Sequence, residues 1–257
     1  MSKEYWNRKA VDYNNYALSW HWLTVGYLPV LSTLKEHCKG LKNIQILDFG
    51  CGNGRIGQIY KKYYHANVTG VDLSEKMIEE AKYKDPSSVY SILNAEYKIL
   101  LDTEFDCAMA NWVLIEVNSL EIMIKELKEI YKRLKPGGIF VALVNNDDFI
   151  GEKSQTWQNG IKSKKYSSGD KIISSFFCED NKRIDFQNYF WTDDDYSSAF
   201  RSSGFKNVKS FVPEYNSSKN IEEIKYLQNK NFFPDVNYRI PATEKPTKLI
   251  TGIKELK

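Results

Sequence analysis

The residues with the clearest chemistry surround a glycine-rich loop that follows an apolar run. The stretch Ile46–Arg55 reads I-L-D-F-G-C-G-N-G-R, in which one acid, Asp48, precedes three alternate glycines. Glycine lets the backbone turn tightly and lets a ligand reach main-chain N–H groups with no Cβ in the way. A second acid, Asp72, ends the next apolar run about 20 residues on, where an acid accepts hydrogen bonds from ribose hydroxyls. Together these residues predict a nucleoside-binding crevice.

The charge beside the loop helps to distinguish between two nucleoside ligands. Gly52-x-Gly54-x-x-Gly57 also fits the dinucleotide fingerprint, so an NAD-binding oxidoreductase is one alternative. However, the place directly after the strand is Gly50, and the position five residues on is Arg55 instead of glycine. The carboxylate of Asp48 would repel a pyrophosphate and attract a cation. S-adenosylmethionine carries an ammonium and a sulfonium and has no phosphate, so the charges favour it.

Four stretches resemble the class I S-adenosylmethionine-dependent methyltransferases, in the order and spacing of that family. They lie between about Ile44 and Val144 and read I-L-D-F-G-C-G-N-G, V-T-G-V-D-L-S-E-K-M-I-E-E-A, F-D-C-A-M-A-N-W-V-L and L-K-P-G-G-I-F-V-A-L. Farther on, Y-F-W-T-D-D-D-Y-S-S-A-F-R-S-S-G-F-K-N-V resembles the small-molecule members, toxoflavin-synthase-like enzymes among them. The resemblance implies a methyltransferase that uses S-adenosyl-L-methionine and releases S-adenosyl-L-homocysteine.

The resemblance also implies which residues hold the cofactor. The loop from Gly50 to Gly54 would line the methionine moiety, and Asp48 would reach its ammonium group. Asp72 would hold the ribose, and the main-chain carbonyl of Asn111 would meet the ammonium. Leu73 and Met77 would pack on the adenine, although Met77 suits the core equally well. Asn94 and Ala95 stand where the family often has an Asp-Ala pair that recognises the edge of the adenine. Asn94 replaces the acid, but an amide oxygen also accepts hydrogen bonds from the exocyclic amine. The expected cofactor-binding set is Asp48, Gly50, Cys51, Gly52, Asn53, Asp72, Leu73, Met77, Asn94, Ala95, Asn111 and Trp112, with Cys51 a packing residue and not a nucleophile.

The acceptor and its base are less clearly specified. The fourth strand ends in N-W-V-L and lacks the Pro-Pro of family members that act on planar adenine or glutamine nitrogens. A small organic acceptor is therefore expected, methylated on N or O and less often on C. Methyl transfer mainly needs alignment and removal of a proton, so spacing does not reveal the base. Glu116, His21 and Tyr16 are the candidates, each of which also suits a structural role. Cyclisation or cleavage of the cofactor's aminobutyryl chain stays open as an alternative.

Composition sets limits on partners and location. The chain of 257 residues has a net charge of +3, which favours neither nucleic acid nor an anionic membrane. Its four cysteines form no C-x-x-C pair, which argues against zinc and for a reducing, cytoplasmic location. No metal is expected, because Asn111 stands where metal-dependent relatives carry an acid. The chain should act as a monomer or homodimer, without a signal peptide or membrane span.

The elements that must position these residues follow from the alternation of short β-branched runs with helical patterns. The pattern predicts an α/β fold with a Rossmann-like, doubly wound seven-stranded sheet, mostly parallel with an antiparallel last strand, plus a β-hairpin insertion and an N-terminal helical segment. The predicted strands are Gln45–Gly50, Asn67–Asp72, Ser88–Asn94, Phe105–Asn111, Gly138–Asn145, Phe205–Val212 and Lys248–Leu256. The predicted helices are Gly54–Tyr64, Ser74–Lys84, Ser119–Leu134 and Thr192–Ser203, and the hairpin pairs Lys171–Cys178 with Lys182–Phe190.

One domain is expected over residues 1–257, made of a helical cap (1–40), a cofactor-binding core (41–145), an insertion that serves as a substrate lid (146–191) and the rest of the sheet (192–257). Long loops beyond the carboxyl ends of parallel strands often cover a ligand. The cap and the hairpin are both rich in aromatic residues, which could enclose an apolar chamber or simply pack on the sheet. These residues are Tyr5, Trp6, Tyr13, Tyr16, Trp20 and Trp22 in the cap, and Phe176, Phe177, Phe186, Tyr189, Phe190 and Trp191 in the hairpin.

Overall fold

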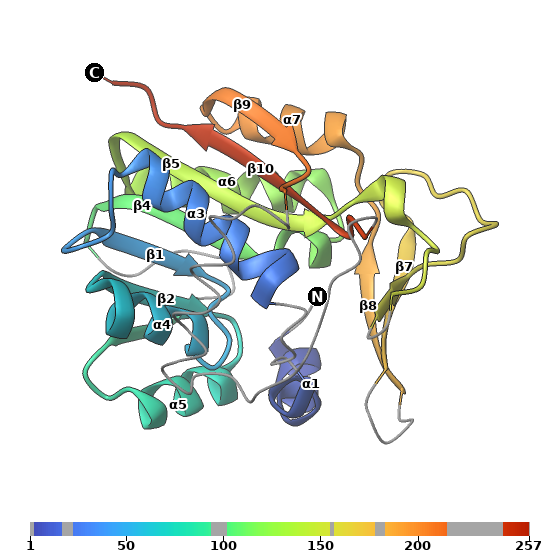
Figure 1. Cartoon of the computed structure of the whole chain (residues 1–257), viewed down its shortest axis with the longest axis horizontal. Coiled ribbons are helices and arrows are strands. Elements are labelled where there is room, and N and C mark those ends of the chain that lie inside the picture. Colours follow the sequence, from blue (N-terminus) through green and yellow to red (C-terminus); the bar gives the residue numbers. More distant parts are fainter. Residues whose placement is uncertain are drawn as a thin grey trace.

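The computed structural model describes residues 3–16, 23–93, 102–154, 157–177, 183–214 and 244–256. Its centre is a seven-stranded sheet of order β3-β2-β1-β4-β5-β10-β9 (Figure 1). Only β10 runs antiparallel to its neighbours, β5 and β9, which confirms the predicted antiparallel last strand. The strands are β1 (Gln45–Phe49), β2 (Asn67–Asp72), β3 (Val89–Ile92), β4 (Phe105–Asn111), β5 (Leu134–Asn145), β9 (Lys206–Phe211) and β10 (Thr247–Ile253).

Helices cover both faces of the sheet, as expected of parallel strands that are apolar on both sides. On one face, α3 and α4 bury side chains such as Leu31 and Ile59 against alternate residues of β1, β4 and β5. On the other face, α6 and α7 do the same with side chains such as Leu127 and Phe200. The helices are α3 (Leu28–His37), α4 (Arg55–Tyr64), α5 (Glu75–Lys84), α6 (Leu120–Arg133) and α7 (Asp193–Ser202).

Hydroxyl side chains begin three of these helices where the sequence predicts it. Ser74 accepts a hydrogen bond from the backbone N–H of Met77 at the start of α5, and Ser119 accepts one from Ile122 at the start of α6. Thr192 and Asp195 form a reciprocal capping box at the start of α7. Such caps satisfy backbone N–H groups that have no partner within the helix.

The chain differs from the prediction around Lys135-Pro136-Gly137-Gly138, which the sequence suggests is a turn. The structure begins β5 earlier, at Leu134. Gly137 has φ +81° and donates to the carbonyl of Lys254, so the turn lies inside an irregular strand. The pairing with β4 shifts between Phe105 and Cys107, which absorbs the additional residues.

Two additions extend the chain beyond the carboxyl ends of the parallel strands (Figure 1). The first is the N-terminal helix α1 (Lys3–Tyr16), which contacts α5. The second is a three-stranded antiparallel sheet of β6 (Trp157–Asn159), β7 (Lys171–Phe177) and β8 (Arg183–Tyr189). The β7–β8 hairpin confirms the prediction, whereas β6 lies in a part of the insertion (146–191) where no strand is predicted. Three residues are too few to show an alternating pattern, so its sequence gives no strand signal.

Candidate functional site

The glycine-rich loop joins β1 to α4 in a backbone conformation that side chains would disturb. Gly50, Gly52 and Gly54 all have positive φ, at +74°, +52° and +73°. A Cβ on Gly50 would lie 2.3 Å from a methyl carbon of Val113, closer than atoms can approach. The N–H groups of Gly50 and Cys51 donate to the carbonyl of Val71, at 2.8 and 3.0 Å. The loop is therefore fixed to the end of β2.

Asp72 holds the ends of the first two strands together. Its carboxylate accepts one hydrogen bond from the N–H of Gly52 at 2.9 Å and another from the N–H of Ser74 at 2.8 Å. Burial raises the pKa of Asp72, and the backbone hydrogen bonds oppose that rise. A partly buried carboxylate held by backbone donors keeps its position before any ligand arrives.

Two further acceptors face the same region. Asp48 is 2% exposed. Burial, followed by repulsion from Asp72, raises the pKa of Asp48 to about 7. The side-chain oxygen of Asn111 is buried and has no hydrogen-bond partner among the residues that the structure describes. Acceptors without donors are costly to bury, so this region suits a ligand that brings N–H groups or positive charge.

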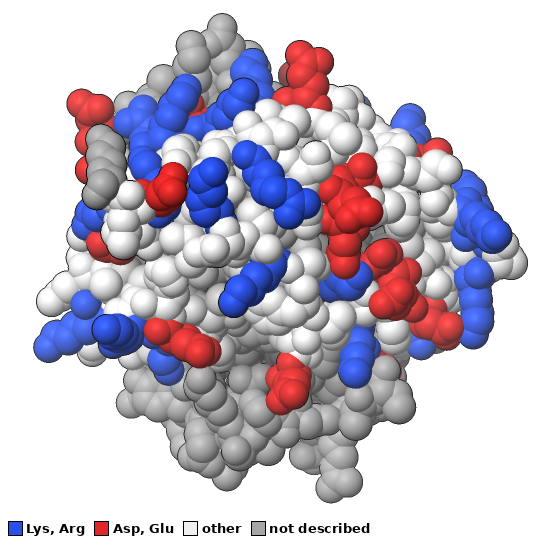
Figure 2. Space-filling view, turned by 90° about the horizontal axis from the view of Figure 1, so that it is seen from above, with Lys and Arg blue, Asp and Glu red and all other residues white. Residues whose placement is uncertain are grey.

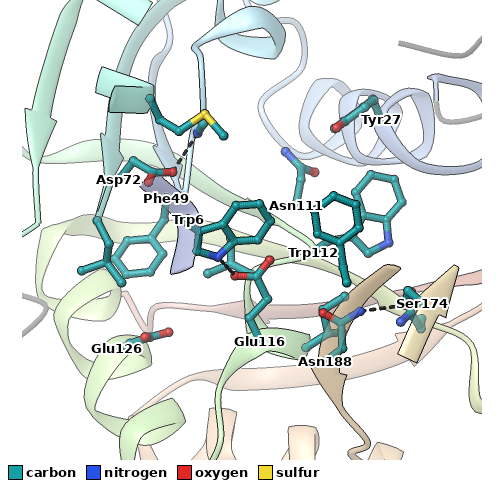
Figure 3. A pocket seen from close by; sticks show the side chains of 18 of the residues that line it. Trp6, Tyr27, Phe49, Asp72, Asn111, Trp112, Glu116, Glu126, Ser174 and Asn188 are labelled. Carbon is teal, nitrogen blue, oxygen red and sulfur yellow. Dashed lines mark hydrogen bonds between the residues drawn. The ribbon is translucent and has the colours of Figure 1, made fainter. Parts of the chain in front are cut away.

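Two adjoining pockets lie at this end of the sheet and share Tyr27, Gly50 and Asn111 as lining residues. Asp72 and Phe49 lie at one end of the larger pocket, and Ser174 and Asn188 lie at the other (Figure 3). Of the expected cofactor-binding residues, Gly50, Gly52, Asp72, Leu73, Met77, Asn111 and Trp112 line the larger pocket, and Asp48, Cys51 and Asn53 line the smaller one. Asn94 and Ala95 lie outside the described residues.

Trp112 occupies an unusual position between β4 and the larger pocket. Its φ is +58°, a left-handed conformation that bulky residues rarely adopt. Its ring meets Tyr27 edge to face, with centroids 5.3 Å apart, and a Cβ on Gly26 would lie 2.4 Å from it. Strained residues of this kind occur often at binding sites, where the surrounding structure holds them.

Glu116 is the candidate base that the structure describes in full. It ends a short 3-10 helix, η2 (Leu114–Glu116), and its carboxylate accepts a hydrogen bond of 2.6 Å from the indole N–H of Trp6 in α1 (Figure 3). Burial raises the pKa of Glu116 well above its ordinary value, while the hydrogen bond from Trp6 opposes the rise. Tyr16 is the last residue of α1, but its side chain, like the whole of His21, lies outside the described part.

Aromatic residues from both additions meet at the larger pocket. The rings of Trp6 and Phe186 stack with centroids 5.8 Å apart, and Phe176 meets Phe186 edge to face at 5.2 Å. These three line the pocket, as does Trp157, which the prediction omitted. Trp191 instead packs in the hydrophobic core on the face of the sheet that α6 and α7 cover, and its indole N–H donates to the carbonyl of Val117.

The structure also places Glu126 in the pocket lining, which sequence reasoning missed. Glu126 lies on α6, is 3% exposed, and has one carboxyl oxygen that contacts no donor in the described part of the chain. Burial raises the pKa of Glu126 to about 8. The sequence carries a signal for Glu126, because the apolar residues Met123 and Ile130 stand three residues before it and four residues after it. Both are fully buried in the structure. An acid at that spacing lies on the apolar face of the helix.

Two observations concern other kinds of site. Within the described ranges, no group of three or more His, Cys, Asp or Glu side chains is arranged to hold a metal ion. The helices described here are also too short or too polar to cross a bilayer.

Comparisons with known proteins agree with this geometry. Residues 47–142 match the model of a methyltransferase domain family. The chain is 27% identical over 206 residues to N-demethylindolmycin N-methyltransferase of Streptomyces griseus, covering 79% of this chain and 86% of that protein. It is 38% identical over 138 residues to a malonyl-[acyl-carrier protein] O-methyltransferase of Priestia megaterium, covering 53% of this chain and 49% of that protein. The chain thus spans about half the length of the latter relative.

A solved structure has the same fold. The S-adenosylmethionine-dependent methyltransferase from Clostridium acetobutylicum superposes with a TM-score of 0.58 at 16% identity, covering 90% of this chain and 91% of that one. The domain match and the relatives agree on methyl transfer, and the solved structure agrees on the fold. Residues 47–142 are a methyltransferase domain, and the protein is an S-adenosylmethionine-dependent methyltransferase with S-adenosylmethionine as its cofactor.

Proposed function

We propose that this methyltransferase acts on a nitrogen or oxygen of a small organic molecule, held between α1 and the β7–β8 hairpin. One observation carries the proposal. The crevice that Asp48, Asp72 and the glycine-rich loop line is continuous with the aromatic part of the larger pocket, here called the chamber, which Glu116 also lines. The first part suits the cofactor, and the second suits an apolar acceptor. Basic and acidic side chains are interspersed over the face seen in Figure 2, which favours a small acceptor over a polyanion.

The residues of the crevice fit the cofactor chemically. Asp48 and the side-chain oxygen of Asn111, which has no partner among the described residues, would accept hydrogen bonds from its ammonium, and Asp72 would accept them from the ribose hydroxyls. Gly50 lines both pockets and would bring the main chain of the loop close to the methionine moiety. Leu73 and Met77 line the pocket and would pack on the adenine. When bound, S-adenosylmethionine supplies an electrophilic methyl group on a sulfonium.

Glu116 would remove the proton from the acceptor. A buried carboxylate with a raised pKa is a stronger base than an exposed one, and its pKa lies closer to that of an amine or hydroxyl. The hydrogen bond from Trp6 would hold the carboxylate in one orientation. Trp6, Phe176 and Phe186 would exclude water and align the acceptor.

The names of the relatives support this choice of acceptor atom. One relative is an N-methyltransferase and the other is an O-methyltransferase. Both elements carry a lone pair and a removable proton, so the same carboxylate would serve either.

Product analysis tests the proposal. The protein is incubated with S-adenosylmethionine and panels of small amines, phenols and carboxylic acids, and the products are identified by mass spectrometry. We expect S-adenosylhomocysteine in amounts equal to the methylated acceptor. Glu116→Gln should lower kcat by about 10²- to 10⁴-fold with little change in affinity for S-adenosylhomocysteine. Methylthioadenosine in place of S-adenosylhomocysteine would show that the cofactor's aminobutyryl chain reacts instead.

A further inference from the structure

The wall of the chamber that faces Glu116 contains a buried polar relay among aromatic rings. Asn159, Ser174 and Asn188 come from β6, β7 and β8 respectively, and all three are at most 4% exposed. Asn159 pairs directly with Ser174 across β6 and β7, so the two side chains lie on the same face. Ser174 and Asn188 line the pocket together with Phe176 and Phe186.

The relay fixes the orientation of the Asn188 amide. The hydroxyl of Ser174 donates to the side-chain oxygen of Asn159 at 2.9 Å. A hydroxyl has only one hydrogen, so Ser174 accepts from its other neighbour, and the amide N–H of Asn188 donates to it at 2.7 Å. The oxygen of Asn188 is therefore turned away from Ser174. Figure 3 shows it on the side of the cavity where Glu116 lies.

The chamber thus presents two hydrogen-bond acceptors to its ligand, the Asn188 oxygen and the Glu116 carboxylate. The carboxylate of Glu116 carries several lone pairs, so it can accept a hydrogen bond from a ligand N–H beside the one from Trp6. A ligand group that carries only lone pairs, such as an ether oxygen, would face two acceptors and gain nothing from them. Around them, the stacked rings of Trp6 and Phe186 line the pocket and would pack against the apolar body of the ligand.

We infer that Asn188 and Glu116 form a two-acceptor clamp for an amine, so that the methyl acceptor is a primary or secondary amine on an apolar, ring-sized body. This inference rests on the proposed function and narrows its acceptor from nitrogen or oxygen to an amine nitrogen. Asn188 is a specificity-determining residue, Ser174 positions it, and Asn159 positions Ser174. Methylation removes one N–H donor from the amine, so the product is held more weakly than the substrate.

Paired probes of the same shape test the clamp. N-methylbenzylamine and benzyl methyl ether share a benzyl group and differ in whether an N–H or a bare oxygen occupies the chain. Binding of each to the protein saturated with S-adenosylhomocysteine is measured by ligand-observed NMR titration. The parent should bind the amine at least about tenfold more tightly than the ether. Equal affinity for the two, including no detectable binding of either, would overturn the inference.

Four variants assign the preference to the relay. Asn188→Leu, which keeps the volume and removes the acceptor, should weaken amine binding about tenfold and leave the ether unchanged. Asn188→Asp keeps an acceptor and should retain amine binding. Ser174→Ala should weaken amine binding about three- to tenfold because the amide is no longer oriented. Ser175→Ala makes the same change at the next residue on β7 and should have no effect.

The outcomes separate the clamp from the proposed function. Affinity for S-adenosylhomocysteine and the thermal midpoint should be unchanged in Asn188→Leu. An unaltered amine preference in that variant would show that Asn188 only packs the wall, even if methyl transfer is intact. Failure of the parent to bind S-adenosylhomocysteine or to methylate any acceptor would contradict the proposed function itself.

Discussion

Four acidic side chains lie at the carboxyl end of the sheet. Asp48 and Glu126 are buried, Asp72 and Glu116 are partly buried, and burial raises the pKa of each. Such burial lowers stability unless a partner is present. Hydrogen bonds support Asp72 and Glu116, whereas one oxygen of Glu126 lacks a donor within the described ranges. Acids with raised pKa values around a pocket are typical of ligand-binding and catalytic sites.

Asp72→Ala should weaken cofactor binding because it removes a charge-assisted contact to the ribose. The loss should be about 1.5–3 kcal/mol, measured by calorimetry with S-adenosylhomocysteine. The N–H groups of Gly52 and Ser74 also lose their acceptor, so the unfolding temperature should fall. Glu80→Gln, on the exposed side of α5, is the control and should change neither quantity. Unchanged affinity in Asp72→Ala would refute the ribose assignment.

Glu126→Leu should stabilise the protein without cofactor. The ordinary pKa of a glutamate is 4.5, and in the folded state that of Glu126 is about 8. Between these values the folded state holds one more proton than the unfolded state, so stability falls as the pH rises. Near pH 8 the free energy of unfolding of Glu126→Leu should exceed the parent's by about 2–4 kcal/mol, as measured in urea. A less stable variant would show that the carboxyl has a structural partner.

At the scale of elements, most of the fold could be predicted from the sequence. The ranges of β2 and β4 agree with the prediction residue for residue, because each is an apolar run bounded by turns or charges. The helices α5, α6 and α7 begin at Ser or Thr caps that the sequence shows directly. The relay of Asn159, Ser174 and Asn188 could not be predicted, because it depends on register across three strands. Alternation shows which residues share a face, but not which face of an added sheet meets the pocket.

The helix α1 joins the two halves of the site, so a small change in it should separate acceptor from cofactor binding. Trp6→Phe keeps a ring to stack on Phe186 and removes the donor to Glu116. We expect kcat/KM for the acceptor to fall about tenfold, which corresponds to one hydrogen bond, with S-adenosylhomocysteine affinity within about threefold of the parent. A chain lacking residues 1–20 should lose turnover. Parent-like turnover of that truncated chain would remove α1 from the site.

At the scale of the whole molecule, acidic side chains gather at the carboxyl ends of the parallel strands, where a cationic ligand would compensate their negative charge. The cofactor carries an ammonium, so its binding and the ionisation of Asp48 should be linked. Asp48 has an ordinary pKa of 3.8 and a pKa of about 7 in the folded protein. Ionised Asp48 is unfavourable without cofactor and is the form that would bind an ammonium. Stability and affinity should therefore depend on pH in opposite directions.

Between pH 4 and 7 the folded protein without cofactor keeps a proton on Asp48 that the unfolded chain has lost. Its free energy of unfolding should therefore fall by about 1.4 kcal/mol per pH unit from this group, up to about 4 kcal/mol in all. Affinity for S-adenosylhomocysteine should rise about tenfold per unit between pH 5 and 7 and then level off, because binding no longer has to displace the proton. Asp48→Asn should abolish the rise in affinity and remove this contribution to the fall in stability, while the contribution of Glu126 remains. Urea unfolding and calorimetry across this range measure both quantities. Parallel pH profiles of the parent and Asp48→Asn would show that another group controls the site.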